Sequence, residues 1–180
     1  IDEVEEGREY AILLSTCAGA WRYLIGDVVK FVDKDRDEIV ITGRTKHFLS
    51  LCGEHLSVAN MNKAIETVSR ELNITIKEFS VAGVPCETLL AHHWYIGTDD
   101  VVDVTLLKEK LDTCLKQLND DYAVERGAAL QAVYVDVLPV STFYDWMEVN
   151  GKVGAQNKFP RVLKKPQLED WRAFIQLEQP

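Results

Sequence analysis

The sequence lacks the features that mark several large classes of protein. No apolar run approaches the ~20 residues of a membrane-spanning helix, and no basic-then-apolar targeting segment stands at its beginning. The sequence also has few basic residues: 20 Lys and Arg against 29 Asp and Glu, which gives a net charge of −9. Nonspecific binding to a nucleic acid needs a basic surface. We therefore expect neither a membrane nor a nucleic acid as a partner.

Cysteine is sparse and shows no pairing pattern. The four cysteines are scattered, without a CxxC pair: Cys17, Cys52, Cys86 and Cys114. Such spacing does not predict a disulfide framework, and reduced thiols are typical of a cytoplasmic protein, which is the location we predict. The pair His92-His93 does not indicate a metal site, since neighbouring residues of a strand point to opposite faces. No metal site is therefore predicted in this chain.

The sequence has instead the composition of an ordinary globular protein, with 47% apolar and 27% charged residues among 180. Residues 8–45 favour an all-β meander with turns between its strands. Four strands are expected, at 9–15, 21–25, 28–32 and 38–42, with Gly26-Asp27 as the turn between the second and the third. A meander of this size is too small to stand alone, so we expect it to pack against another part of the polypeptide.

From Ser57 onwards the apolar spacing becomes that of helices and short strands. Ser57 and Asp103 are suited to cap the first two helices. In chain order we predict helix 57–73, strands 76–84 and 89–96, a helix that begins at Asp103 and includes Tyr122 in its apolar stripe, strand 131–138, a short helix near 142–149 and helix 167–177. This pattern predicts an α+β fold in which helices cover a small mixed sheet on one side. We place the domain boundary between residues 46 and 52.

Two segments carry the residue types of a nucleotide site. Asp27 follows Gly26 at the predicted turn, where an ionised carboxylate can accept hydrogen bonds from two ribose hydroxyls. Residues 151–161 hold two glycines and three cations, among them Lys158, although the Walker pattern GxxxxGK[ST] is absent. A lysine on such a loop can neutralise a phosphate. The alternatives are an ordinary hairpin turn and a mobile surface loop.

Two further segments are candidates for the same site. Arg44 ends the fourth predicted strand, where it is placed to approach a ribose or phosphate while the residues after it act as a hinge; the alternative is a solvated strand end. Gly53-Glu54-His55 precedes the first helix. It is either a plain loop, or it presents Glu54 or His55 to a bound nucleotide.

Three segments, taken in order, resemble the auxin-responsive Gretchen Hagen family of acyl-acid amido synthetases. They are residues 21–29 (Trp-Arg-Tyr-Leu-Ile-Gly-Asp-Val-Val), 48–51 (Phe-Leu-Ser-Leu) and 156–161 (Gln-Asn-Lys-Phe-Pro-Arg). Plant members carry Tyr-Arg-Tyr-Arg-Val-Gly-Asp, Leu-Leu-Ser and Asn-Gln-Tyr-Lys-Thr-Pro-Arg at these places. The likeness covers nearly the whole chain and leans towards the bacterial branch of the family.

The resemblance implies an adenylate-forming enzyme whose smaller C-terminal domain swings between two poses. In such enzymes ATP and Mg²⁺ activate a small carboxylic acid as an acyl-adenylate, which an amino acid attacks to give an amide and AMP. Asp27 matches the ribose-binding aspartate and Lys158 the catalytic lysine that meets the phosphates. Arg22 and Tyr23 match the motif before the aspartate, and Arg44 matches a basic residue near the hinge.

The chain departs from the family pattern in two ways. His55 stands where plant members have a nucleotide-contacting lysine, and an imidazole is shorter and mostly neutral near pH 7. The phosphate loop and the acyl pocket are absent from these 180 residues. The resemblance therefore implies a β-strand remnant of the large domain at 1–46 and the mobile α+β domain at 47–180. We expect the missing N-terminal domain as a partner and no ligase activity from the chain alone.

Two alternatives stay open. One is an acyl-CoA-type ligase of the same superfamily, which assays with thiol and amine acceptors would separate from an amide-forming enzyme. The other is a non-catalytic binding or interaction module, for which replacing Lys158 in the full protein would change nothing. The sequence does not name the acid or the acceptor.

Overall fold

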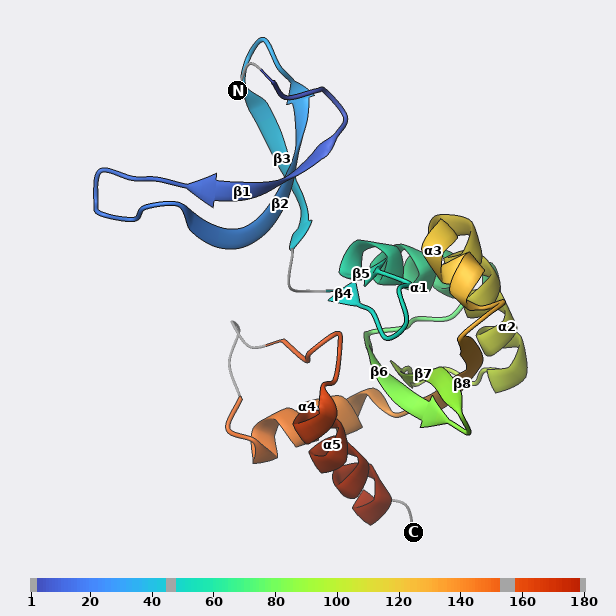
Figure 1. The fold of residues 1–180 in the computed structure, drawn as a ribbon. Coiled ribbons are helices and arrows are strands. Elements are labelled where there is room, and N and C mark those ends of the chain that lie inside the picture. The colour runs from blue at the N-terminus through green and yellow to red at the C-terminus, as the bar shows by residue number, and fades with distance from the viewer. Residues whose placement is uncertain (1–2, 45–47, 153–157, 179–180) are drawn as a thin grey trace. The chain divides into compact units, whose positions relative to one another are not determined.

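The computed structural model describes residues 3–44, 48–152 and 158–178. The chain divides into two compact units (Figure 1). The first unit comprises residues 1–48 with 57–59, and the second comprises residues 49–56 with 60–180. Within the described residues, no helix combines the length and the apolar character needed to cross a membrane.

The first unit is an antiparallel sheet of three strands in the order β1-β2-β3. The strands are β1 (Glu9–Leu14), β2 (Tyr23–Asp33) and β3 (Glu38–Arg44). The two strands predicted at 21–25 and 28–32 are thus one continuous strand, and the hairpin turn predicted at Gly26-Asp27 is wrong.

A β-bulge takes the place of that turn. Ala11 faces Val28 across the sheet whereas Leu13 faces Leu24, so β2 holds two more residues than β1 between these pairs. Gly26 has a φ of +91°, which glycine adopts without strain and which suits a bulge. A Gly-Asp pair is compatible with a turn and with a bulge. The local sequence therefore did not distinguish the two.

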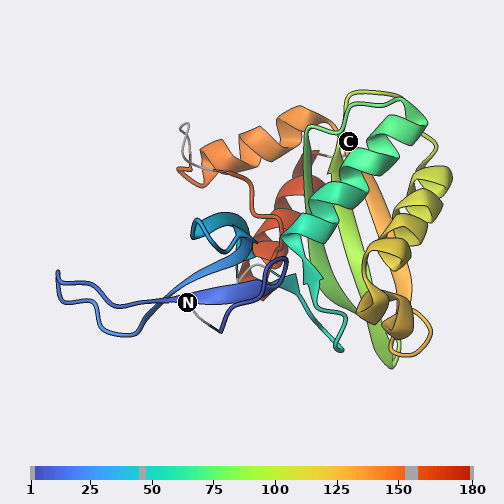
Figure 2. The same ribbon diagram turned by 90° about the horizontal axis from the view of Figure 1, so that it is seen from above.

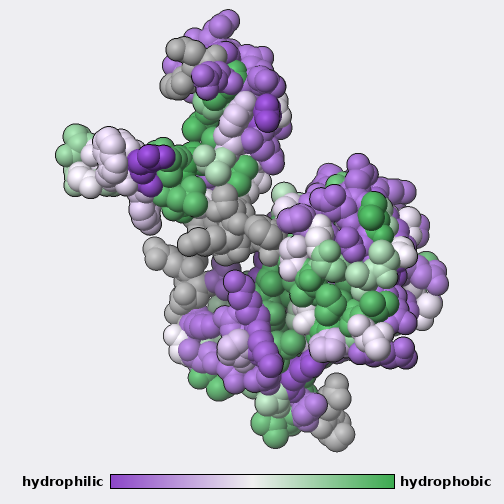
Figure 3. All heavy atoms as spheres, viewed as in Figure 1, coloured by the Kyte–Doolittle hydropathy of each residue, from purple (hydrophilic) through white to green (hydrophobic). Residues whose placement is uncertain are grey.

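Apolar side chains of the first unit are largely exposed. Val29 is buried, whereas Trp21 is 81% exposed and Ile41 69% exposed. The other large apolar residues of this unit that are exposed are Leu13, Leu14, Tyr23, Leu24, Ile25, Val32, Ile39 and Val40. Figure 3 shows apolar residues at the surface of these strands. A small sheet with this much open apolar surface has no sufficient core of its own, as expected for a meander that packs against further polypeptide.

The second unit has the predicted α+β fold. A short strand pair, β4 (Phe48–Leu49) and β5 (Leu56–Ser57), lies where the chain passes from the first unit to the second. Its main elements are α1 (Val58–Leu72), β6 (Glu78–Cys86), β7 (Leu89–Gly97), α2 (Val104–Leu118), α3 (Asp120–Glu125), β8 (Leu130–Leu138), α4 (Val140–Val149) and α5 (Lys165–Glu178). The predicted elements agree with these, apart from shifts of a few residues at their ends and the separate helix α3.

The sheet of the second unit is mixed, as predicted. Its order is β6-β7-β8, with β6 antiparallel and β8 parallel to the central strand β7. Helices lie on both faces, with α1 and α2 on one side and α4 and α5 on the other (Figures 1 and 2). The expectation of helices on one side is wrong because β6 and β7 contain consecutive buried residues, which is the mark of a sheet covered on both faces.

An aromatic cluster forms the core beneath α4 and α5. Trp171 is fully buried, and its ring centroid lies 5.1 Å from that of Phe143, 5.9 Å from that of Trp146 and 5.0 Å from that of Phe159. Aromatic pairs at these separations contribute beyond the area that they bury. Since Phe159 follows directly on Lys158, this core also holds one end of the loop that carries the lysine.

The second helix begins where the sequence predicts and ends earlier. The Asp103 carboxylate accepts hydrogen bonds from the backbone N–H groups of Thr105 and Leu106, at 2.9 and 3.1 Å. Asn119 ends α2 and caps α3, where its side-chain oxygen accepts from the N–H of Tyr122 at 2.7 Å. Tyr122 therefore belongs to a separate short helix rather than to the apolar stripe of α2.

Replacing Asp103 with alanine is expected to lower the free energy of unfolding by about 1 kcal/mol, because two N–H groups of the first helical turn lose their acceptor. Urea unfolding measures the loss. Glu109→Ala on the exposed face of the same helix is the control, with an expected change within about 0.5 kcal/mol. Equal stabilities of the two variants would contradict a role for the cap.

Candidate active site

Asp27 and Arg44, two of the predicted site residues, are cross-strand neighbours in the first unit. Asp27 follows the bulge at Gly26 and pairs with Arg44 in the register of β2 and β3. The side chain of Asp27 is half-buried, and that of Arg44 lies outside the described residues. Bulges are common beside active sites, where they change the direction of a side chain.

Arg22 and Tyr23 stand at the start of β2. Arg22 has a φ of +47°, and its backbone N–H donates to Ser15 Oγ at 3.1 Å. Tyr23 opens the strand opposite Leu14 and is exposed. Tyr23 thus begins the strand that continues through the bulge to Asp27, and Arg22 stands directly before it.

Lys158 lies at the C-terminal end of the predicted loop, whose residues 153–157 are outside the described part of the chain. The lysine is exposed, and the next residue, Phe159, is buried in the aromatic cluster. The backbone of the following residues runs beside β6. There Ser80 Oγ donates to the carbonyl of Pro160 at 2.7 Å, and the N–H of Val81 donates to the carbonyl of Arg161 at 3.0 Å. The backbone directly after Lys158 is therefore held in place by the core and by β6.

The other end of the loop is held by α4. The N–H of Lys152 donates to the carbonyl of Met147 at 2.8 Å, and its ammonium lies 5.1 Å from the centroid of the Trp146 ring. A cation over an aromatic face at this distance is attracted to it. Of the cations in this segment, Lys152 thus has an aromatic partner inside the unit, whereas Lys158 is exposed.

Arg161 is tied to β6. Its Nη1 donates to Glu78 Oε2 at 2.7 Å and to the carbonyl of Phe79 at 2.9 Å. Its guanidinium carbon lies 4.3 Å from the centroid of the Phe79 ring. These contacts give Arg161 an anchoring role that the sequence did not reveal.

Glu54 and His55 have opposite environments. Glu54 is fully buried, so its proposed contact with a nucleotide is excluded. His55 is exposed, has a φ of +38°, and places Nδ1 3.7 Å from a carboxylate oxygen of Asp121. Of the two candidates before α1, His55 alone is open to a ligand.

Glu54 fixes the segment before α1 to the sheet. Its carboxylate accepts hydrogen bonds from the N–H groups of Leu51 and Cys52, at 2.9 and 3.0 Å, and from Nε2 of the fully buried His92 at 2.9 Å. Burial opposes ionisation, but these donors outweigh it and lower the pKa of Glu54 to about 2. Burial, together with the neighbouring Glu54 carboxylate, raises the pKa of Cys52 to about 12.

Sequence reasoning missed this buried pair, although two signals pointed to it. A glutamate follows an apolar run, and His92 lies within an apolar strand. Polar residues of this kind are seldom buried without a hydrogen-bond partner. Each of the two therefore indicated a polar partner elsewhere in the chain. The prediction that His92 and His93 face opposite sides of the sheet is confirmed, since His92 binds Glu54 whereas His93 Nε2 lies 2.8 Å from Asp136 Oδ2.

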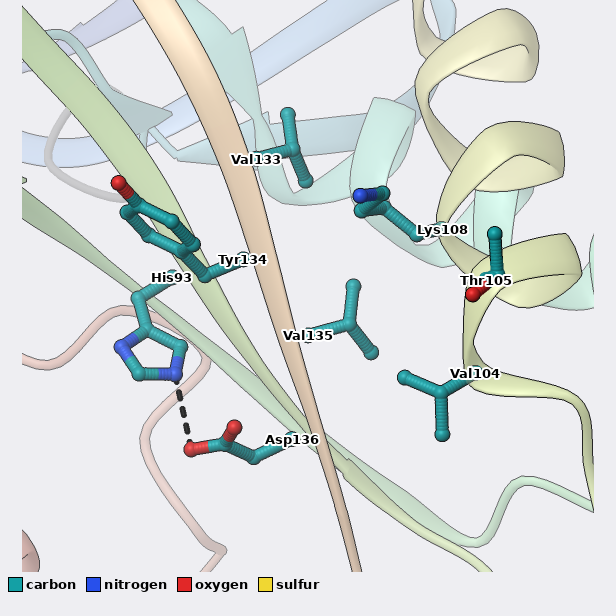
Figure 4. Close-up of a pocket in the computed structure, with 8 residues that line it drawn as sticks. All are labelled: His93, Val104, Thr105, Lys108, Val133, Tyr134, Val135 and Asp136. Atoms are coloured by element: carbon teal, nitrogen blue, oxygen red, sulfur yellow. Dashed lines mark hydrogen bonds and ion pairs between the residues drawn. The ribbon is translucent and has the colours of Figure 1, made fainter.

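A cavity of about 290 Å³ lies along the outer edge of β8, beside α2 (Figure 4). Figure 4 shows Tyr134 and Asp136 on one side of the strand and Val133 and Val135 on the other, with His93 bonded to Asp136. None of the predicted site residues lines it. We therefore do not include this cavity in the candidate active site.

The predicted site residues divide between the two units. Arg22, Tyr23, Asp27 and Arg44 belong to the first unit, and His55 and Lys158 to the second. In the part of the chain that the structure describes, no three His, Cys, Asp or Glu side chains gather in a way that could hold a metal ion. Each unit thus carries its own share of the candidate residues.

The chain, whose second unit has a sheet covered by helices on both faces, shares the fold of the matching part of an acyl acid amido synthetase. The structure of the GH3.15 acyl acid amido synthetase matches 95% of this chain with a TM-score of 0.77 and 18% sequence identity, over 34% of its own length. The structure of AtGH3.15 in complex with 2,4-DB matches the same share with a TM-score of 0.76.

Family comparisons agree with the fold. The model of the GH3 family C-terminal domain matches residues 59–167, and that of the GH3 family central domain matches residues 1–43. The chain belongs to the GH3 family, and the resemblance found in its motifs is confirmed. The indole-3-acetic acid-amido synthetase GH3.4 of Arabidopsis thaliana is 31% identical over 176 residues, which cover 88% of this chain and 29% of that protein. The chain thus spans less than a third of this relative.

Proposed function

We propose that this chain works as the C-terminal portion of a ligase that uses ATP to join a small carboxylic acid to an amino acid as an amide. Membership of the GH3 family carries the proposal, because the relatives named above are amido synthetases. Residues 1–46 would belong to a large domain and residues 47–180 would form the mobile domain. The open apolar surface of the first unit supports a larger partner domain in the same polypeptide.

Lys158 is proposed as the catalytic residue. Its ammonium is exposed, and Phe159 beside it is fixed in the core, so the charge can be presented from a rigid base. Positive charge held where negative charge grows in a transition state is usually a large catalytic term. A swing of the domain would bring the lysine to the phosphates and would exclude water from the activated acid.

The remaining predicted residues are proposed to bind the nucleotide. Asp27, half-buried after the bulge, would accept the two ribose hydroxyls through its carboxylate. Tyr23 precedes it on β2, Arg22 stands directly before that strand, and Arg44 is its cross-strand neighbour. His55 is exposed and stands where the family has a lysine. Its side chain is shorter than that of lysine, so it would contact the nucleotide over a shorter distance.

ATP and Mg²⁺ would be required by the complete enzyme. The carboxylate of Asp27 and the ammonium of Lys158 fit the chemistry of a ribose and a phosphate. The described residues offer no group of three ligands for Mg²⁺, so we assign the ion no ligand in this chain. Cytoplasmic location stays a prediction, for which the four free cysteines are the support.

Acid-dependent ATP–pyrophosphate exchange tests the proposal. The complete polypeptide that carries this chain should catalyse exchange with at least one member of a panel of carboxylic acids, and the 180-residue chain by itself should not. Exchange by the chain alone would contradict the need for a large domain. No exchange by the complete polypeptide with any acid would contradict the ligase.

A further inference from the structure

A second cavity lies between α1 and the outer edge of β6, next to the segment that follows Lys158. Its volume is about 340 Å³. It is lined by Asn62, Ile65, Glu66 and Ser69 of α1, by Ile76, Lys77 and Phe79 along the chain into β6, and by Arg161. The four α1 residues follow the spacing of a single helical face. None of the eight has a role in the proposed reaction.

The walls of this cavity are partly apolar. Ile65 and Phe79 are buried, and Ile76 is half-buried. A cavity of this size, with an apolar wall and a few convergent polar groups, is typical of a site for a small organic molecule.

Three charged side chains line the cavity, and each has an ion-pair partner of its own. Two cations, Arg161 and Lys77, line it together with one carboxylate, Glu66. That carboxylate is already paired with Lys63 at 3.3 Å and with Arg70 at 2.9 Å. Lys77 is likewise paired with Asp99 at 3.4 Å and Arg161 with Glu78 at 2.7 Å, so an anionic ligand would bind to donor groups that these pairs leave open.

The guanidinium of Arg161 has donor groups that suit a carboxylate. Its Nη1 is used by Glu78 and by the carbonyl of Phe79, and the ring of Phe79 fixes the plane of the guanidinium. Its Nε and Nη2 donate to no other described residue. That edge of a guanidinium matches the two oxygens of a carboxylate, so a ligand could bind it without breaking the existing contacts.

We propose that this cavity binds a small monocarboxylate with an apolar body. The carboxylate pairs with the open edge of Arg161, near Lys77, and the apolar part lies against Ile65 and Ile76. The ligand class rests on the proposed function, since the acid substrate and the amide product of that reaction can both have this chemistry. A polyphosphate fits less well because apolar side chains form much of the wall.

The cavity lies beside the segment that follows Lys158. Arg161 is three residues after Lys158, and its carbonyl accepts the N–H of Val81 on β6. A carboxylate on the guanidinium shares the charge that now balances Glu78, which is 2.7 Å away. The cavity therefore adjoins the segment that follows Lys158.

Titration of the 180-residue chain, followed by amide-proton NMR, tests the site. Phenylacetate stands for the acid, N-phenylacetylglycine for the conjugate, and phenylacetamide is the uncharged isostere. At least one of the two carboxylates should bind saturably, with a Kd at least about 10-fold below that of phenylacetamide. Whichever binds more tightly identifies the source of the ligand as substrate or product. Equal binding of phenylacetamide, or no saturable shift up to about 10 mM of either carboxylate, would overturn the proposal.

Variants separate this cavity from binding elsewhere. Asn62→Trp, at an exposed position on α1, fills the mouth of the cavity and should weaken binding at least about 10-fold. Lys77→Gln should weaken it less. Lys110→Gln removes an exposed lysine of α2 that pairs with Glu71 at 2.8 Å, and it should leave binding unchanged. Unchanged affinity in Asn62→Trp, with its NMR spectrum showing a folded chain, would refute the assignment. The titration contains no nucleotide, so absence of binding would not contradict the ligase proposal. Absence of ATP–pyrophosphate exchange would likewise not contradict binding to this cavity.

Discussion

Replacing Lys158 with alanine in the complete polypeptide is expected to lower acid-dependent ATP–pyrophosphate exchange by about 100- to 1,000-fold, the usual effect of removing one preorganised charge-stabilising group. The lysine projects from a backbone that Phe159 fixes in the aromatic core, so its loss removes charge without disturbing that anchor. Lys158→Arg keeps the charge but changes its shape and reach, and should recover part of the activity.

Lys152→Ala is the matched control for this prediction. Lys152 belongs to the same predicted loop, but its ammonium lies over the Trp146 ring at 5.1 Å. Its replacement should leave the exchange rate close to that of the unchanged protein. Equal losses in both variants would mean that the reaction needs the total positive charge of the loop and that Lys158 has no special role, and full activity of Lys158→Ala would remove Lys158 from the mechanism.

Glu54→Ala is expected to lower the free energy of unfolding of the second unit by about 3–5 kcal/mol. The substitution leaves His92 Nε2 and the N–H groups of Leu51 and Cys52 without their acceptor. Glu54→Gln should cost nearly as much, because both carboxylate oxygens accept backbone N–H groups and an amide nitrogen would face donors in place of one of them.

Tryptophan fluorescence during urea unfolding measures this effect. The second unit has three buried tryptophans that report on it: Trp94, Trp146 and Trp171. Glu66→Ala is the control, since Glu66 is an exposed residue whose ion pairs with Lys63 and Arg70 contribute at most about 1 kcal/mol. Similar midpoints for the Glu54 and Glu66 variants would show that the buried contacts of Glu54 do not stabilise the unit.

The same carboxylate predicts a dependence on pH. The pKa of Glu54 is about 2 in the folded chain against an ordinary value of 4.5. Because the folded pKa is the lower one, the stabilisation is complete above pH 4.5 and is lost as the pH falls towards 2. The stability difference between the unchanged chain and Glu54→Gln should therefore shrink over that interval. A difference that stays constant would contradict the lowered pKa.

Local patterns predicted the second unit well and the first unit less well. The helix α1 and the cap of α2 at Asp103 follow from apolar spacing and from side-chain chemistry within a few residues. The bulge at Gly26 did not, because it depends on the partners of β2 on both sides, which a local pattern does not contain. Burial of both faces of β7 likewise depends on helices that follow much later in the chain.

The candidate site shows the same division. Asp27 and Lys158 could be selected because motif order carries information that single residues lack. The pairing of Glu54 with His92 joins residues that lie 38 positions apart, and Arg161 meets Glu78 across 83 positions. Contacts over such separations leave no periodic trace, so the sequence grouped Arg161 with the loop cations and left Glu54 as a possible ligand contact.

Product analysis of the complete polypeptide tests the central claim most directly. The protein would be supplied with ATP, Mg²⁺, a panel of carboxylic acids, amino acids and coenzyme A, and the products identified by mass spectrometry. The account predicts one amide together with an equal amount of AMP, and loss of both in Lys158→Ala. A thioester of coenzyme A in place of the amide, or no consumption of ATP with any acid, would contradict it.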